Sequence, residues 1–400
     1  MTYKWTQAID SGQMAGVCLI DMSAAFDLVD HNLMIEKMSI YGFSESTCLW
    51  FLNYLSNRRQ CVSINGIVSI LLPVALGVPQ GSVLGPLLYT LYTNEFPEII
   101  EKEENQDTIS CYADDTTLTC VSSDHTMLSR RLTLSYQQIH NFLTSNKLKV
   151  NEDKTHLIVI STSKARARSQ AANLVEVTTD SKIVKSSRTE KLLGCQIQDD
   201  LKWSEYIRNN ESSLLKSLSI KLNALKIISK VADFKTRKTI ANGIIMRRLS
   251  YMITVWSSCS KDLMDSLQVV QNRAARIVTR RKWDTSTAEN LQEIGWLSVN
   301  QMAKYYTILQ LHQVIEDKTP RSIASMFNWD YSYTTRQAVS NKIKPIGTPR
   351  LQQSHESFRW RSTRLYNLLP MELTQMKDIK AFKQELKRWT IENIPIRMKK

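Results

Sequence analysis

The chain has 400 residues, of which 42% are hydrophobic and 22% are charged, so it can bury two or three cores and is not a disordered protein. Its seven cysteines include no Cys-x-x-Cys pair, which argues against a zinc knuckle or a disulfide framework and favours an intracellular compartment, the nucleus or the cytoplasm. No signal-peptide pattern opens the chain, and the longest apolar run, 67–78, is broken by Pro73 and Gly77, so we predict no membrane segment.

The net charge of +14 is distributed unevenly along the chain. Residues 1–125 carry a net charge of −10, whereas residues 126–250 and 251–400 carry +13 and +11. An acidic first third followed by two basic thirds is typical of a metal-dependent enzyme that acts on a polyanion. Surface lysines that only keep the protein soluble are the alternative reading. We expect nucleic-acid binding, because the basic excess accompanies paired aspartates.

The first third begins with a polar segment at 1–13, read as the tail of a helix, and a short apolar strand at 17–20 that ends in Asp21. The pattern then predicts, in chain order, core helices at 33–41 and 46–55, an antiparallel hairpin of 60–64 and 67–72 around Asn65-Gly66, a turn-prone loop at 77–82, a helix at 83–96 and an acidic loop at 98–107. Strands that alternate with crossover helices predict an α+β fold.

Two adjacent aspartates stand between β-prone runs in the segment 108–120. The runs predict a hairpin with Asp114 and Asp115 at its tip. Adjacent carboxylates repel each other and lose solvation, so a chain places them together at a tight turn mainly when a cation compensates their charge. An exposed Asp-Asp turn is the plain alternative. A strand that delivers Asp21 at its end could bring a third carboxylate to this hairpin.

The remaining segments are predicted to be mainly helical. They are, in chain order, a helix at 124–146 capped by Asp124, a strand at 157–160, a polar loop at 161–172, helices at 204–230, 233–251, 262–282, 288–294 and 298–317, a mobile or disordered connector at 331–358, and helices at 360–369 and 378–393. Lys226 and Lys230 make the first of the long helices basic. Arg273, Arg276 and Arg280 share one face of the 262–282 helix, which suits phosphate contacts or a solvated surface equally well.

Three of these segments resemble motifs A, B and C of the reverse transcriptase palm in order and spacing. Motif A corresponds to the strand with Asp21, motif B to the loop with Gln80 and Gly81, and motif C to the hairpin with Asp114 and Asp115. The segment 148–160 resembles motif D, and 191–203 resembles motif E. The resemblance is closest to the non-LTR (LINE-type) retrotransposons of the jockey kind.

A group II intron maturase or a telomerase-like polymerase shares this palm and is the weaker alternative. Phe26-Asp27, the segment 112–115 and the Gln-Asn-Arg-Ala-Ala-Arg run at 271–276 favour the retrotransposon reading. The resemblance implies a palm at 1–200 with an antiparallel sheet backed by helices, a helical thumb at 201–250 and a helical extension at 251–400. In the family a fingers subdomain precedes motif A, and only about twenty residues precede Asp21 here, so we expect a truncated reading frame without fingers or endonuclease.

The resemblance also implies the reaction and its metal ions. Asp21, Asp114 and Asp115, with the backbone carbonyl of Met22, would hold two Mg²⁺ ions, with Mn²⁺ as a possible substitute, for nucleotidyl transfer. Lys154 corresponds to the motif D lysine, which would neutralise or protonate the pyrophosphate.

The same resemblance implies the remaining contacts. Phe26 would pack under the nucleotide sugar and reject a 2′-hydroxyl, and Gln80 and Gly81 would lie against the template and the nucleotide. Leu193 and Gly194 would hold the primer terminus. The partners implied are an RNA template, a DNA primer and dNTPs, with the oligomeric state open. An inactive RNA-binding remnant is the alternative function, because the fingers are missing.

Overall fold

The computed structural model describes residues 1–101, 107–170, 175–282, 284–327, 343 and 349–396. No helix among them is long and apolar enough to cross a membrane. The chain forms two compact units, which we call the sheet unit (residues 12–193) and the helical unit (residues 1–11 and 194–400). The division therefore falls at 193/194, where the sequence placed it at 200, and the first eleven residues belong with the helices.

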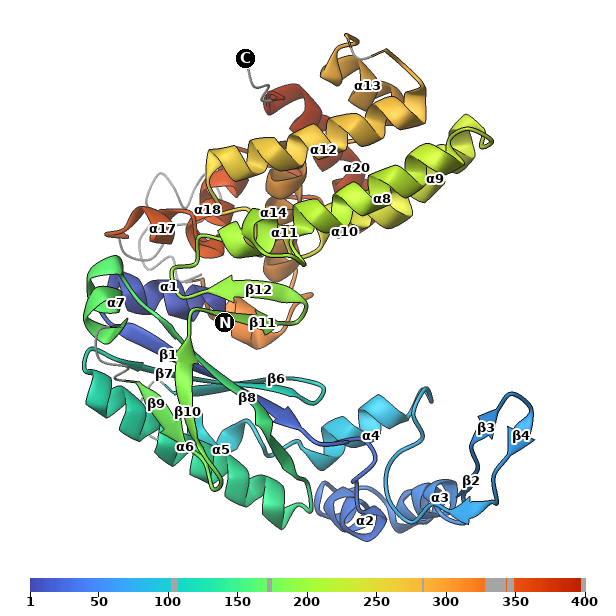
Figure 1. Cartoon of the computed structure of the whole chain (residues 1–400), viewed down its shortest axis with the longest axis vertical. Helices are drawn as coiled ribbons and strands as arrows, with labels where there is room; N and C mark the ends of the chain where they lie inside the picture. Colours follow the sequence, from blue (N-terminus) through green and yellow to red (C-terminus); the bar gives the residue numbers. More distant parts are fainter. Residues whose placement is uncertain (102–106, 171–174, 283, 328–342, 344–348, 397–400) are drawn as a thin grey trace. The chain divides into compact units, whose positions relative to one another are not determined.

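A six-stranded sheet within the described residues is the centre of the sheet unit, with strand order β6-β7-β1-β8-β10-β9 (Figure 1). Its strands are β1 (Met14–Met22), β6 (Thr108–Tyr112), β7 (Asp115–Ser122), β8 (Val150–Ile160), β9 (Glu176–Thr178) and β10 (Ile183–Ser187). The apolar β1 is buried on both faces and pairs antiparallel with β7 and β8. Only β10 runs parallel to its neighbour β8, so the predicted α+β architecture is confirmed.

Helices cover this sheet and complete its core. They are α2 (His31–Ile40), α3 (Glu45–Leu55), α4 (Gly85–Tyr92), α5 (Glu98–Glu101), α6 (His125–Ser145) and α7 (Ser163–Gln170). Helix α6 begins at its predicted cap, where Asp124 accepts a hydrogen bond from the Met127 amide, and it lies along the sheet in Figure 1. Leu128 and Leu132 pack so closely on β1 that a side chain at Gly16 would meet them.

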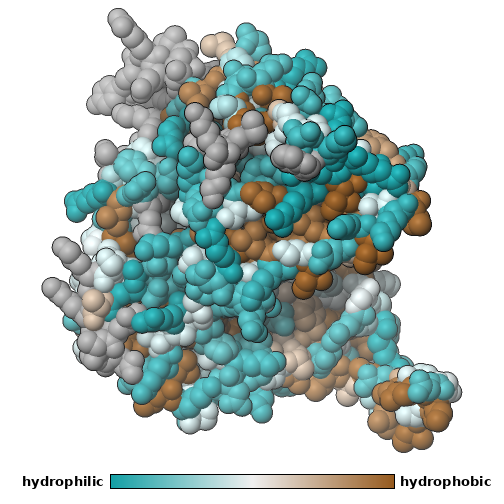
Figure 2. Space-filling view, turned by 45° about the horizontal axis from the view of Figure 1, so that its top comes forward, coloured by the Kyte–Doolittle hydropathy of each residue, from teal (hydrophilic) through white to brown (hydrophobic). Residues whose placement is uncertain are grey.

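The predicted hairpin around Asn65-Gly66 is present but is broken into two short ladders. Strands β3 (Ser63–Ile64) and β4 (Ile67–Val68) pair at its tip, and β2 (Arg59–Gln60) pairs with β5 (Leu72–Pro73) at its base. Asn65 and Gly66 both have positive φ, as a two-residue hairpin turn requires. The hairpin extends away from the sheet in Figure 1, and its apolar side chains form the exposed brown surface at the lower right of Figure 2.

Helix α3 differs from its prediction as a core helix. Cys48 and Leu55 are buried, but Leu49 and Trp50 are each more than half exposed. The sequence is apolar on most sides, but only part of the helix surface is covered. Phe51 and Tyr54 pack against the core, and Leu49 and Trp50 lie on the surface.

The helical unit contains the segments from 194 onward together with the N-terminal helix. Its described elements are α1 (Thr2–Asp10), β12 (Cys195–Gln198), η1 (Glu205–Asn209), α8 (Leu214–Ile228), α9 (Phe234–Ala241), η2 (Asn242–Met246), α10 (Arg247–Ser250), α11 (Ile253–Trp256), α12 (Lys261–Thr279), α13 (Thr287–Ile294), α14 (Val299–Ile315), α15 (Arg321–Ala324), α17 (Gln352–His355), α18 (Phe358–Tyr366), α19 (Met371–Thr374) and α20 (Ile379–Asn393). Leu311, Phe382 and Leu386 belong to the core that joins α14, α18 and α20. The Asp10 carboxylate at the end of α1 accepts hydrogen bonds from the amides of Arg350 and Leu351, which fixes α1 to this unit.

Three sequence expectations were wrong in their local structure. The predicted helix 204–230 is interrupted because the Asn210 side chain accepts hydrogen bonds from Ser212 and turns the chain, so that α8 starts anew. The predicted loop 161–172 contains α7, whose residues are mostly good helix formers. The first residues of the predicted acidic loop form α5. The predicted connector 331–358 lies largely outside the described residues, but its last part contains α17.

Candidate active site

Two strand ends bring the three predicted carboxylates together within the sheet unit. In the β1–β7 ladder Ile20 pairs with Thr116, so the next residues outward, Asp21 and Asp115, meet at the same end of the sheet. Tyr112 pairs with Asp115 across the β6–β7 hairpin, and Ala113 takes a positive φ in the turn that presents Asp114. The predicted hairpin is therefore present, and strand pairing carries Asp21 to its tip from far away in the sequence.

At this end of the sheet, the charges of two carboxylates affect the pKa of the third. Burial raises the pKa of the Asp115 carboxyl, and the negative charges of Asp114 and Asp21 raise it further. Burial also raises the pKa of the Tyr89 hydroxyl, with a further contribution from Asp114. Two carboxylates that oppose the ionisation of a third form, together with it, a site that a cation would stabilise.

Lys154 supplies a positive charge at the edge of this cluster. Its Nζ lies 3.6 Å from Oδ2 of Asp21, and its side chain is 70% exposed. The register of the β1–β8 ladder shifts between Leu19 and Asp21, an irregularity of the kind that redirects side chains near active sites. The predicted motif D lysine therefore lies beside the motif A carboxylate.

Phe26 and Tyr89 form an aromatic pair next to the carboxylates. Their rings are stacked with centroids 4.5 Å apart, and the Tyr89 hydroxyl donates to Sδ of Met22 over 3.3 Å. The sequence did not single out Tyr89, because an aromatic residue on a buried helix is usually a core residue. The stacking of Tyr89 on Phe26 holds the Phe26 ring in a fixed position beside motif A.

The motif B loop is held against the segment that follows motif A. The amides of Gly77 and Val78 donate to the carbonyls of Val29 and Phe26, each over 2.8 Å. Gln80 donates through Nε2 to Oδ1 of Asp27, also over 2.8 Å. These bonds bring Gln80 within the neighbourhood of Phe26, as the motif order predicts.

In the motif B loop, glycine is required at position 77, but not at position 81, for a steric reason. Gly77 has φ +87°, and a Cβ there would lie 2.8 Å from backbone atoms of Asp27. Gly81 also has a positive φ, but the space around it is open. The sequence assigned Gly81 to close approach of the template and nucleotide, which stays a prediction, whereas Gly77 is required for packing within the protein.

The residues predicted to contact nucleic acid lie far along the sequence from Asp21, Asp114 and Asp115. Of these residues, only Leu193 belongs to the sheet unit. Leu193 and Gly194 both have positive φ, which suits the two-residue turn of the motif E hairpin between β11 (Thr189–Leu192) and β12. Lys226 and Lys230 are exposed on and just after α8.

The arginine face predicted at 262–282 is only partly correct. Arg273 is exposed on α12, and Nε of Arg276 is buried without a hydrogen-bond partner. Arg280 takes a left-handed conformation after the helix ends at Thr279, so it leaves that face. Its guanidinium donates to the carbonyls of Ser229, Lys230 and Ala232 at the end of α8 instead.

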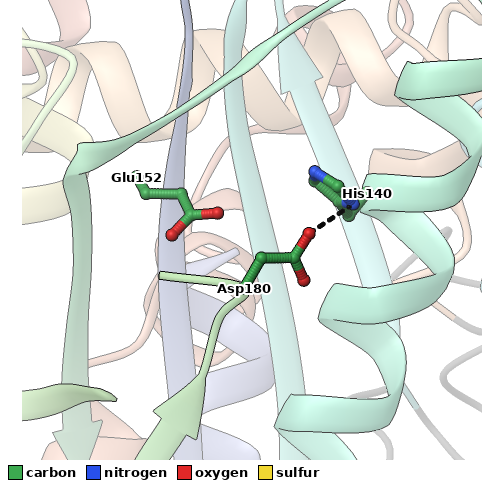
Figure 3. A group of neighbouring side chains, drawn as sticks. All are labelled: His140, Glu152 and Asp180. Atoms are coloured by element: carbon green, nitrogen blue, oxygen red, sulfur yellow. Dashed lines mark ion pairs between the residues drawn. The ribbon is translucent and has the colours of Figure 1, made fainter. Parts of the chain in front are cut away.

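The three aspartates fit a hard cation in donor chemistry, since carboxylate and carbonyl oxygens are the ligands that such ions prefer. Their mutual repulsion and the nearby Lys154 ammonium both indicate a place for positive charge. A second group of potential metal ligands is present among the described residues, formed by His140, Glu152 and Asp180 (Figure 3). One ligand atom from each of these side chains lies within 4.8 Å of the other two.

Comparison with known proteins agrees with this geometry. Residues 4–197 match the family described as reverse transcriptase (RNA-dependent DNA polymerase). This part of the chain belongs to the reverse transcriptase family. The match contains all three aspartates, the motif B loop and Lys154, and it ends within β12. Members of the family depend on divalent metal ions.

The reverse transcriptase relatives are proteins of mobile elements. The chain is 23% identical over 320 residues to the RNA-directed DNA polymerase from mobile element jockey of Drosophila melanogaster, covering 76% of this chain and 33% of that protein. It is 23% identical over 330 residues to the jockey polymerase of Drosophila funebris, covering 80% and 34%. The chain thus spans about a third of these curated relatives. The prediction of a jockey-like reverse transcriptase is confirmed.

A solved structure of apo telomerase from Candida tropicalis is also similar. The TM-score is 0.38 at 14% identity, and the alignment covers 97% of this chain and 56% of that one. This similarity is too distant for any conclusion to rest on it.

Proposed function

We propose that this chain is an RNA-directed DNA polymerase that extends a DNA primer on an RNA template. The observation that carries the proposal is the β1–β7 register, which brings Asp21 to the hairpin with Asp114 and Asp115. The relatives named RNA-directed DNA polymerase support the same activity.

Asp21, Asp114 and Asp115 would hold two divalent ions, and the Met22 carbonyl would add an oxygen ligand. Mg²⁺ is the ion we propose, with Mn²⁺ as a substitute, because all these donors are oxygens. When bound, such ions activate the primer 3′-hydroxyl and stabilise the leaving pyrophosphate. The carboxylates would orient the ions, and the raised pKa of Asp115 without metal reflects the neighbouring charges of Asp114 and Asp21, which the ions would neutralise.

The residues around the carboxylates would select and position the nucleotide. Phe26, held by its stack on Tyr89, would exclude a 2′-hydroxyl, and Gln80, held by Asp27, would face the template and the base. Lys154 lies 3.6 Å from Asp21 and is exposed enough to turn toward a phosphate. Its release from Asp21 would allow it to offset charge on the pyrophosphate.

The test is dNTP incorporation on a primed RNA template with millimolar Mg²⁺, comparing the parent chain with Asp114→Ala. We expect the substitution to reduce incorporation by at least 10³-fold, because a metal ligand is lost. Asp153→Ala is the matched control, since that side chain is 98% exposed and lies on the neighbouring strand. Equal incorporation by the parent and Asp114→Ala would reject the proposal. Salt-sensitive RNA binding without incorporation by either would identify an inactive RNA-binding protein instead.

A further inference from the structure

A second group of potential ligands lies in the sheet unit, separate from the three aspartates. His140 projects from α6, Glu152 from β8, and Asp180 from the turn between β9 and β10, and their side chains converge in Figure 3. One ligand atom from each lies within 4.8 Å of the other two, and His140 Nδ1 is 3.4 Å from Asp180 Oδ2. Three elements that are distant in sequence thus offer one nitrogen and two carboxylate donors to one point.

The Glu152 carboxylate of this group is held in place by hydrogen bonds from neighbouring residues. Oε2 of Glu152 accepts from Oγ1 of Thr179 over 2.7 Å and from the Ser181 amide over 3.0 Å, and the Ser181 hydroxyl also donates to it. These bonds fasten the β9–β10 turn, which carries Asp180, to β8. Ligands that are already held in position favour metal binding, because their side chains lose little conformational entropy when the ion binds.

A buried hydroxyl beside the group has no hydrogen-bond partner within the part of the chain that the structure describes. This hydroxyl is Oη of Tyr136, which is fully buried one helical turn before His140. Its ring is nearly parallel to the His140 imidazole, at 18° and 6.3 Å between centroids, so both side chains leave α6 in the same direction.

We propose that His140, Glu152 and Asp180 bind a divalent transition-metal ion, with Zn²⁺ as the best-fitting ion. One imidazole nitrogen and two carboxylates form a set that suits zinc and its first-row neighbours, whereas Mg²⁺ prefers oxygen ligands alone. Three protein ligands leave a fourth position for water, and that water would give the Tyr136 hydroxyl its missing partner. The ion would tie α6 to β8 and to the β9–β10 turn, and so stabilise the sheet unit away from the polymerase carboxylates.

Zinc binding to the complete 400-residue chain tests the proposal. In chelator-treated buffer without Mg²⁺, we expect the parent to bind one more equivalent of Zn²⁺ than His140→Gln, measured by equilibrium dialysis, and its thermal midpoint to rise by about 5 °C at saturation. Co²⁺ should give a visible absorption band that His140→Gln lacks. His156→Gln is the matched control, because His156 also pairs with a carboxylate, Glu190 at 3.6 Å, and should bind like the parent.

Two further variants separate the possible outcomes. Asp114→Asn should keep the extra zinc equivalent, and loss of zinc from that variant alone would assign the ion to the polymerase carboxylates and overturn the proposal. Tyr136→Phe should weaken zinc binding by on the order of tenfold, because the bound water loses its partner. Equal zinc stoichiometry in the parent and His140→Gln would show that the group is an ordinary ion pair.

Discussion

At the scale of single residues, the negative charge of Asp115 lowers the stability of the metal-free protein but would favour binding of a cation. Its carboxyl has a pKa above the ordinary value because of burial and its neighbours Asp114 and Asp21. A carboxyl with a raised pKa in the folded state favours folding when protonated, and this contribution is lost as the pH rises through the folded-state pKa. The arrangement that would attract cations therefore weakens the metal-free protein at neutral pH.

We expect Asp115→Asn to stabilise the metal-free chain at pH 7 by about 0.5 kcal/mol, a small value because the side chain is exposed and screened. The gain should vanish below the ordinary aspartate pKa, where both versions are neutral, and shrink in 1 M NaCl. Urea unfolding at pH 3 and pH 7 without metal measures this. A stabilisation that is the same at both pH values would mean that charge repulsion is not its cause.

In the proposed polymerase, Phe26 would determine which sugar the site accepts, because its stack on Tyr89 would fix it under the nucleotide. We expect Phe26→Val to increase incorporation of ribonucleotides relative to deoxynucleotides by on the order of 10²-fold, because the ring that opposes the 2′-hydroxyl is removed. Single-nucleotide incorporation with competing dNTP and rNTP measures the ratio. Phe43→Val, which shortens another partly buried ring packed on the same core, should leave it unchanged. An unaltered ratio in Phe26→Val would make Phe26 a packing residue.

At the scale of elements, the loop 77–82 is positioned by backbone hydrogen bonds together with those of two side chains, Gln80 and Ser82. The bonds from Gly77 and Val78 to the segment after motif A leave no room for a Cβ at Gly77. The helix α4 that follows begins with Gly85-Pro86, and Ser82 donates to the Pro79 carbonyl and accepts from the Gly85 amide. The loop is thus a fixed connection between motif A and α4.

We expect Gly77→Ala to destabilise the chain by about 3 kcal/mol, since it combines a backbone clash with a left-handed conformation. Gly81→Ala should cost about 1 kcal/mol, because that residue has a similar φ but open space around it. Denaturant unfolding of both variants gives the comparison. Equal losses would show that φ alone, and not the contact with Asp27, sets the requirement for glycine.

The elements that could be predicted from the sequence are those with local signals. Asp124 caps α6 where predicted, and the Asn65-Gly66 turn is present, because caps and turns depend on neighbouring residues. Tyr89 and the close contact at Gly77 could not be predicted, because each depends on residues brought near only by the tertiary fold. The departure of Arg280 from its helix face is likewise decided by the carbonyls of α8.

At the scale of the whole molecule, the polymerase motifs and the second ligand group belong to one compact unit, residues 12–193. The motifs reveal the family because their spacing is distinctive, whereas His140, Glu152 and Asp180 form no recognisable motif along the chain. Strand order and the packing of α6 are needed to bring those three together. Sequence reasoning could therefore propose Asp21, Asp114 and Asp115 as one site, but it could not bring His140, Glu152 and Asp180 together.

The antiparallel pairing of β1 with β7 also has a consequence for how the protein is made. The two strands are separated by roughly a hundred residues, so β1 leaves the ribosome about 5 to 20 seconds before its partner. During that interval the apolar segment Val17–Ile20 has neither of its neighbours β7 and β8 to cover it. A growing chain therefore exposes an apolar strand that carries Asp21 near its end, and Asp21 can meet Asp114 and Asp115 only after their hairpin has been synthesised.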